Sequence, residues 1–135
     1  MALQLSTTVR NARLYTIEST IGVSAVLKLR TGSAPVTCAT ADSGTVVSTI
    51  TLPSDWMNAA SSGSKTLLGT WQKTNTDNTG TVGYFRLYAS DGTTCHMQGT
   101  VTVSGGGGDL TLDSVTVTAG QTITITSFTL TDANA

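Results

Sequence analysis

Residues Val82–Val103, VGYFRLYASDGTTCHMQGTVTV, carry the clearest hairpin pattern of the chain. Two alternating arms, Gly83–Ala89 and Cys95–Val103, flank a turn in which Asp91 precedes Gly92. Asp-Gly between alternating runs is typical of a two-residue type I′ turn, because both central positions of that turn need a positive φ. The stretch therefore predicts an antiparallel hairpin in a β-rich domain.

Alternation divides this hairpin into two faces, because successive strand side chains point to opposite sides. The apolar face carries Phe85, Leu87, Cys95, Met97, Val101 and Val103. We expect Phe85, Leu87, Met97 and Val101 to face the core. The other face should point outward as a candidate contact with a partner subunit, and it carries Tyr84, Arg86, Tyr88, His96 and Gln98.

Short alternating runs with turn residues between them continue on both sides of the hairpin. Further strands are expected at 24–30, 45–52, 65–73, 109–113, 115–117 and 121–131. Changes of phase predict a kink near Asp113 and a bulge at Ser127. Before both, Gly105–Gly108 should form a flexible or sharply bent connection. Seven or eight short antiparallel strands predict an all-β fold, a β-sandwich or jelly roll.

The first 22 residues read as a helix in front of the strands. Ser6 or Thr7 is a plausible N-cap, and Gly22 stands where a helix would end. Residues at spacings of three and four form a modest apolar stripe that includes one arginine: Val9, Ala12, Arg13, Ile17 and Ile21, with Leu14 beside them. The stripe needs a covering surface, either the domain's own sheet or a neighbouring subunit, so Val9, Arg13 and Ile17 join the candidate interface. The expected organisation is a helical arm at 1–22 and a single jelly-roll-like domain at 23–135.

Charge is sparse in this chain of 135 residues: 11% of residues are charged and the formal net charge is −1. Nothing in this balance favours a nucleic-acid or acidic-membrane partner. The 28 threonines suit the half-buried surface of a sheet. A Thr-rich surface with few charges fits either contact with a partner or an ordinary solvated β surface. No apolar run approaches the ~20 residues of a membrane span, and no signal peptide is visible, so synthesis in a reducing cytoplasm is expected.

Groups able to do chemistry are few. The chain holds one histidine, His96, and one glutamate, Glu18, and its seven aspartates lie mostly in turns. His96 and Cys95 are adjacent on a strand and should point apart, which excludes a Cys-His dyad. Cys38 and Cys95 are expected to be buried free thiols, with a single disulfide as the alternative. We therefore expect no catalytic, cofactor-binding or metal-binding residue and no enzyme activity.

Two further readings rest on weaker patterns. The loop 74–80, TNTDNTG, offers oxygen ligands for calcium, but it lacks the EF-hand spacing, and Asx-turn chemistry explains it more simply. Aromatic side chains exposed on a β-sandwich can stack on sugars, which makes a carbohydrate- or receptor-binding module the alternative function. Its candidate residues are Trp56, Trp71, Tyr84 and Tyr88, although both tryptophans also suit a core.

Five segments of the chain form a recognisable series. They are LQLSTTVRNARLYTIESTIG (Leu3–Gly22), LKLRTGSAP (Leu27–Pro35), TLPSDWMNAASSGSK (Thr51–Lys65), FRLYASDGTTCHMQGTV (Phe85–Val101) and GGGGDLTLDSVTVTAGQTITITSFTL (Gly105–Leu130). In this order they resemble a family of small virion proteins of tailed phages and prophages. The most specific parts of the resemblance are TTCHMQGTV and GGGGDLTLD.

The resemblance implies a jelly-roll-like capsid decoration, or cement, protein on the outer surface of a phage shell. Such proteins often form dimers or trimers at local symmetry axes and brace neighbouring major capsid subunits. The expected partners are thus the major capsid protein and further copies of this chain, and the expected location is the virion. No catalytic residues come with this family, and none are assigned here.

Overall fold

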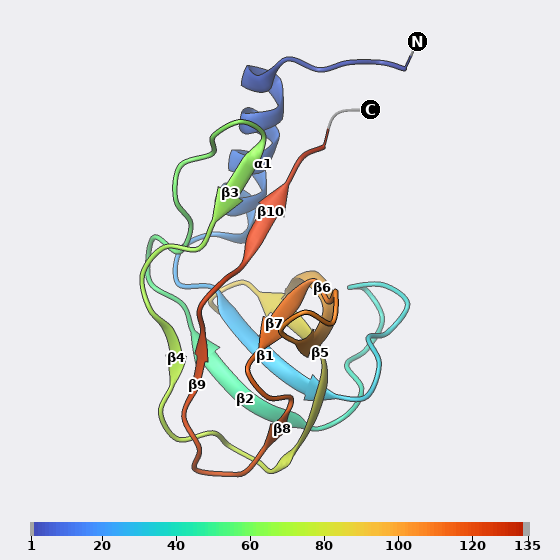
Figure 1. The fold of residues 1–135 in the computed structure, drawn as a ribbon, viewed down its shortest axis with the longest axis vertical. Coiled ribbons are helices and arrows are strands. Elements are labelled where there is room, and N and C mark those ends of the chain that lie inside the picture. The colour runs from blue at the N-terminus through green and yellow to red at the C-terminus, as the bar shows by residue number, and fades with distance from the viewer. Residues whose placement is uncertain (1, 134–135) are drawn as a thin grey trace.

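The computed structural model describes residues 2–133 and shows ten strands and one helix within them. The chain is mostly β structure, with one curled sheet, two short strand pairs and an N-terminal helix (Figure 1). The elements are α1 (Thr7–Ile21), β1 (Val26–Thr31), β2 (Val46–Thr51), β3 (Ser64–Thr66), β4 (Trp71–Lys73), β5 (Gly80–Tyr88), β6 (Cys95–Val103), β7 (Leu110–Leu112), β8 (Thr116–Val117), β9 (Ile123–Ile125) and β10 (Thr129–Thr131). The predicted β-rich fold with an N-terminal helix is confirmed.

The main sheet has the order β2-β1-β5-β6-β7, and β8 pairs with the first residues of β5. β1 is antiparallel to both β2 and β5, with Leu27 opposite Ile50 on one side and Leu87 on the other. Two smaller pairs, β4–β9 and β3–β10, join segments that are far apart in the sequence. These long-range pairings tie the C-terminal third of the chain to its middle.

A single apolar core lies on one side of the curled sheet. Its aromatic members form a row in which Trp56 neighbours Trp71, Trp71 neighbours Phe128, and Phe128 neighbours Phe85. The ring centroids in this row are 6.1, 5.5 and 5.9 Å apart. Offset and edge-to-face contacts at these separations stabilise aromatic pairs beyond their burial. Both tryptophans are therefore core residues.

The helix begins and ends where its capping residues predict. Ser6 precedes it with extended backbone, and its hydroxyl accepts a hydrogen bond from the Val9 N–H at 3.3 Å. Gly22 ends it with φ +91°, a left-handed value that favours glycine, and the Gly22 N–H donates to Glu18 O at 2.9 Å. The described chain contains no helix with the length and apolar composition required to cross a bilayer.

The predicted stripe on this helix is only partly right. Leu14 and Ile21 are the buried residues of α1, and Ile17 is half-buried. Val9 and Arg13 are exposed, because α1 turns its other side to the rest of the chain. That side packs on the β3–β10 pair, called here the ribbon, so this side of the helix is covered by the chain itself. The helix, this ribbon and both ends of the chain lie together at the upper end of Figure 1.

The strand count and direction differ from expectation. Residues 2–133 form ten strands rather than seven or eight, because several expected strands are split into pieces of two or three residues. The run 65–73, for example, is divided into β3 and β4 around Gly69, which has φ +78°. β6 and β7 are parallel rather than antiparallel, with Val101 opposite Leu110.

This parallel pairing depends on the glycine run between β6 and β7. Parallel neighbours usually need a connection of a dozen or more residues. Here Gly105 and Gly107 adopt positive φ values of +86° and +81°, which lets the chain double back within a short loop and then run in its original direction again. Asp109 then fixes the loop, because its Oδ2 accepts hydrogen bonds from the Thr100 N–H at 2.9 Å and hydroxyl at 3.0 Å. Of the two predicted alternatives for Gly105–Gly108, a flexible or a sharply bent connection, the structure shows the sharply bent one.

The turn of the main hairpin is longer than predicted. The Ala89 N–H donates to Thr94 O, and of the two central residues only Gly92 has a positive φ, so the turn is not of type I′. Asp91 shapes the loop instead, because its Oδ1 accepts from the N–H groups of Thr93 and Thr94 at 2.9 Å. The Thr94 hydroxyl, which donates to Asp91 Oδ2 at 2.5 Å, and these two N–H groups hold the pKa of Asp91 far below its usual range.

A bulge at His96 shifts the return strand. Cys95 pairs with Tyr88 and Met97 pairs with Leu87, which leaves His96 as an extra residue. Cys95 therefore joins the face of Tyr88 rather than the apolar face, which corrects the prediction from simple alternation. Val103, also expected on the apolar face, is 45% exposed.

Candidate functional site

The face of the hairpin expected to point outward is covered. Tyr84, Arg86 and Tyr88 are 0%, 2% and 0% exposed, so the prediction that they form an exposed surface is wrong. Gln98 is half-buried. The segment that covers them is residues 32–45, between β1 and β2, called here the covering loop.

Arg86 is the centre of this covered face. Its Nη2 donates to the carbonyls of Thr37 at 3.0 Å and Thr40 at 2.9 Å, and its Nε donates to Gln98 Oε1 at 3.0 Å. Its Nη1 forms an ion pair with Asp42. A buried guanidinium is tolerated when its N–H groups are paired in this way. The cluster therefore acts as an anchor for the covering loop.

Asp42 joins three side chains under the same loop. It pairs with Arg86, accepts from Arg30 Nη2 at 2.8 Å and accepts from the Tyr88 hydroxyl at 2.9 Å. Burial disfavours its charged form, but the hydrogen bonds from Tyr88 and Arg86 outweigh burial and lower the pKa of Asp42. Burial, followed by the bond to Asp42, raises the pKa of Tyr88 to about 12. This part of the predicted site is scaffold.

The helix is held to the ribbon mainly by polar contacts. Lys65 of β3 is 1% exposed, and its Nζ lies 2.6 Å from Glu18 Oε2 and 4.2 Å from the centre of the Tyr15 ring. Arg10 Nε donates to Asp132 O at 2.7 Å. Asn11 Oδ1 accepts from the Gly63 N–H at 2.8 Å. These contacts orient α1 and decide which of its sides stays exposed.

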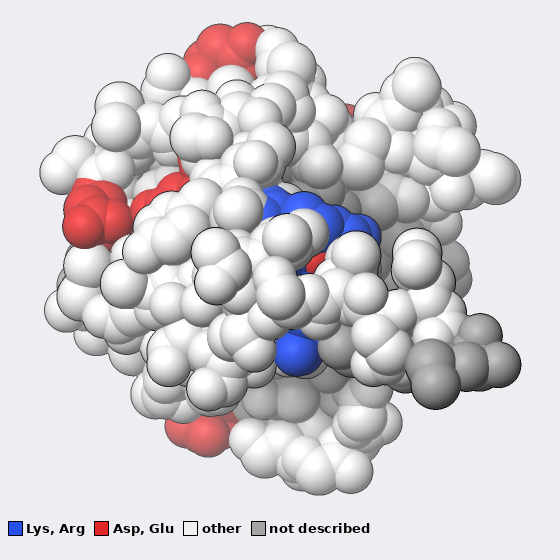
Figure 2. Space-filling model, turned by 90° about the horizontal axis from the view of Figure 1, so that it is seen from above, with Lys and Arg blue, Asp and Glu red and all other residues white. Residues whose placement is uncertain are grey.

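The exposed side of α1 is almost free of charge. Exposed helix faces usually carry charged side chains. Arg13 is the one charged residue on this side of α1, and the others are Val9, Ala12, Tyr15, Thr16, Ser19 and Thr20. We call these seven residues the α1 face. Seen from the helix end, the molecule shows few charged side chains overall (Figure 2).

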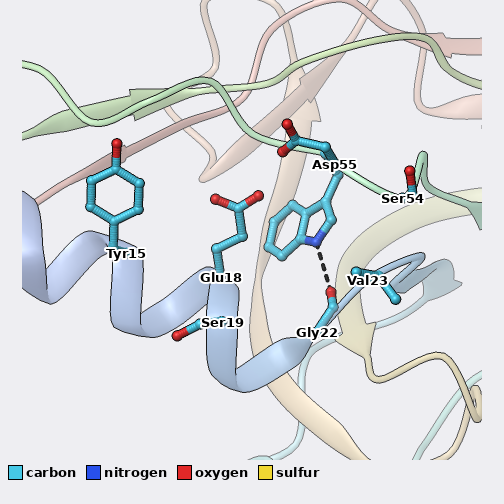
Figure 3. A pocket seen from close by; sticks show the side chains of 8 residues that line it. Tyr15, Glu18, Ser19, Gly22, Val23, Ser54 and Asp55 are labelled. Carbon is cyan, nitrogen blue, oxygen red and sulfur yellow. Dashed lines mark hydrogen bonds between the residues drawn. The ribbon is translucent and has the colours of Figure 1, made fainter.

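A cavity of about 380 Å³ opens beside the last turns of α1. Tyr15, Glu18 and Asp55 reach into it from the helix and from the segment before Trp56 (Figure 3). Trp56 also lines the cavity, and its indole N–H donates to Gly22 O at 3.0 Å. Val23, which follows the helix, is 68% exposed at its rim. The cavity joins an aromatic side chain to two carboxylates.

The eight predicted interface residues are only partly brought together. His96 is exposed and lines a hollow with Ile17 of α1. Val9 and Arg13 lie on the same helix, but Tyr84, Arg86 and Tyr88 lie under the covering loop. The exposed residues Tyr15, Val23 and Asp55 were missed. The spacing of Tyr15 and Ser19 by four residues is a signal for a common helix side, whereas nothing in the sequence indicates that Val23 and Asp55 lie beside them.

The chemical inventory of the site is small. Among residues 2–133, no group of three His, Cys, Asp or Glu side chains is placed to hold a metal ion. In the loop 74–80, Asp77 Oδ2 accepts from the Thr49 N–H at 2.9 Å, and Asn78 Nδ2 donates to Val46 O at 2.8 Å. Those side chains bind the edge of β2. Comparison of the chain with protein-family models, with curated proteins and with solved structures found no match.

Proposed function

We propose that this protein is a structural virion protein of a tailed bacteriophage, a decoration or cement protein that braces neighbouring major capsid subunits on the outside of the shell. The proposal starts from the resemblance of five segments to small phage virion proteins. The observation that carries it further is the α1 face, an exposed helix side with almost no charge. Such a face can enter an interface at a low desolvation cost.

Most of the exposed large apolar side chains belong to α1 and the residues on either side of it, and α1 lies at one end of the molecule (Figure 1). Among residues 2–133, four of the six large apolar side chains that are exposed lie between positions 3 and 23: Leu3, Val9, Tyr15 and Val23. A group of exposed apolar residues marks an interaction site more often than single ones do. We propose that this end contacts the capsid, and that many copies in a symmetric array add up to firm binding through avidity.

Two finer statements belong to the same proposal. The first is that the curled sheet, with β4–β9 across the core from it, belongs to the jelly-roll class that the resemblance implies. The second is that the protein binds further copies of itself, as a dimer or trimer at a capsid symmetry axis. Analytical ultracentrifugation of the purified protein tests self-association, and a monomer at high concentration would remove that part.

A carbohydrate- or receptor-binding role is not favoured by the structure. It depended on the aromatic faces of Trp56, Trp71, Tyr84 and Tyr88, and these side chains are at most 1% exposed. Sugar stacking needs an open ring face, so none of the four offers a stacking platform in this conformation. The capsid proposal therefore keeps the stronger support.

The test is binding to purified shells that lack the protein. Deletion of residues 1–22 is unsuitable, because Leu14, Ile21 and the Gly22 carbonyl are part of the packed structure. Charges placed on the α1 face are milder, so the variant is Thr16→Lys with Thr20→Lys. The control is Thr118→Lys with Thr126→Lys, at two exposed threonines that directly follow β8 and β9. We expect the first pair to reduce occupancy at least tenfold and the control to bind normally. Equal occupancy of both would contradict the proposed face.

A further inference from the structure

The two cysteines, far apart in the sequence, lie in the same polar layer of the fold. The bulge at His96 places Cys95 opposite Tyr88, on the face that the covering loop hides. Cys38 belongs to that loop. Both are free thiols, and both are half-buried. Simple alternation would have placed Cys95 on the opposite side, facing the apolar core.

Hydrogen bonds hold the segment around Cys38 down on this layer. Before it, Pro35 O accepts from Gln98 Nε2 at 2.6 Å. On either side of it, the carbonyls of Thr37 and Thr40 accept from Arg86 Nη2. These hydrogen bonds hold the covering loop against β5 and β6. Cys38 lies between the loop carbonyls that bind Arg86, and Cys95 lies on β6 beneath the loop.

The thiols are close enough to affect each other. Burial raises the pKa of Cys95 to about 12, and side-chain hydrogen bonding and charge repulsion from Cys38 add to the rise. Arg86, which touches the loop on both sides of Cys38, acts in the opposite direction. The pair is thus a direct neighbour of the Arg86 anchor.

We propose that Cys38 and Cys95 form a redox clasp, in which oxidation by a small-molecule disulfide joins them and fixes the covering loop to β6. The reduced pair leaves the loop held by noncovalent contacts alone, the hydrogen bonds of Arg86 and the ion pairs of Asp42. The oxidised pair adds a covalent bond across the Arg86 cluster. This inference concerns the isolated chain and does not depend on the proposed capsid role.

The exchange balances without another reactant. The Cys38 thiolate attacks one sulfur of the external disulfide, forms a mixed disulfide and releases one thiolate, which takes up a proton. Capping Cys38 removes its contribution to the raised pKa of Cys95, while burial still raises that pKa and Arg86 still lowers it. The Cys95 thiol then loses its proton to solvent and attacks the Cys38 sulfur, and the second external thiol leaves. The protein gives up two electrons and two protons, and the external disulfide takes up both.

Oxidised glutathione is the probe, applied to the folded full-length protein. We expect intact-mass analysis to show the loss of two hydrogen masses, and peptide mapping to show a Cys38–Cys95 link. Hydrogen–deuterium exchange should slow in residues 33–42 and stay unchanged in α1. The midpoint of thermal unfolding should rise by roughly 5–15 °C. Cys38→Ser should show none of these changes, and its Cys95 should end as a glutathione adduct or a free thiol.

Three results would overturn the clasp. One is that both thiols remain free under conditions that oxidise a reference dithiol. Another is that each carries glutathione without a link between them. The third is a link that forms in urea and fails to form in the folded protein, since that would show that the native loop keeps the thiols apart. Each of these leaves the capsid-binding experiment with the α1 face unaffected.

Discussion

Lys65 Nζ of β3 lies 2.6 Å from Glu18 Oε2 of α1, and the Lys65 side chain is 1% exposed. A buried ammonium needs its counter-charge, and losing one partner of a buried pair is strongly destabilising. We expect Glu18→Gln to lower the free energy of unfolding by about 3 kcal/mol in urea titrations. Adding Lys65→Met to it should recover part of that loss, because no unpaired charge is left.

An exposed pair serves as the control for this prediction. Lys73 Nζ lies 3.5 Å from Asp77 Oδ1, and both side chains are about one-third exposed. Pairs of this kind contribute little, so Lys73→Gln should cost less than about 1 kcal/mol. Equal costs for Glu18→Gln and Lys73→Gln would show that the helix does not depend on the buried pair.

Asp42 should make stability depend on pH below the neutral range. Its pKa is lowered in the folded state, whereas an unfolded aspartate titrates at about 3.9. Its contribution is therefore complete above that value and is lost as the pH falls through the lowered folded pKa. The stability difference between wild type and Asp42→Asn, measured by urea unfolding, should shrink between pH 5 and pH 2.

Asp113→Asn is the matched control for Asp42. Asp113 is exposed, and it forms no hydrogen bond or ion pair with the other described residues. Its removal should leave stability nearly unchanged across the same pH range. A difference for Asp42→Asn that stays constant with pH would contradict an ionised, hydrogen-bonded Asp42.

Gly83 is required by a close backbone approach. A Cβ at this position would lie 2.0 Å from Gly32 O, which is backbone and has little freedom to move. We expect Gly83→Ala to destabilise the fold by about 3 kcal/mol or more. Gly22→Ala, which has φ +91° but nothing within 4 Å, should cost roughly 1–2 kcal/mol through backbone strain alone. Thermal unfolding of both variants separates the two causes, and equal costs would refute the crowding at Gly83.

Trp56 connects the helix end to the core. Trp56→Phe removes the hydrogen bond to Gly22 O, so hydrogen–deuterium exchange should speed up at residues 18–22. Trp71→Phe also removes an indole hydrogen bond, the one to Leu68 O at 3.1 Å, but neither partner of this bond belongs to the helix or its C-cap. It should leave exchange in α1 unchanged. Equal effects would mean that the helix end is held by general packing.

Local signals predicted most of the secondary structure. Ser6 and Gly22 gave the ends of α1, and alternation gave both arms of the hairpin. The bulge at His96 could not be predicted, because the sequence alternates through it without a break. The extra residue nevertheless puts Cys95 and Met97 on opposite faces of the sheet, where simple alternation puts them on the same face. That one residue decides that Cys95 lies beneath the covering loop.

Long-range contacts decided the rest. Alternation assigned Tyr84, Arg86 and Tyr88 correctly to one face, but it gave no information about what covers that face. The covering loop consists mostly of small residues, and its one carboxylate, Asp42, forms ion pairs with Arg30 and Arg86. In the same way, no pattern within α1 predicts the Glu18–Lys65 contact, and that contact determines which helix side is exposed.

The central proposal implies that a phage or prophage carries this gene, and its most direct test is a quantitative mass-spectrometric inventory of particles purified after infection or induction. A decoration protein should be present in a fixed ratio to the major capsid protein, both in whole particles and in tail-free heads. Absence from purified particles, or presence in tails alone, would contradict it.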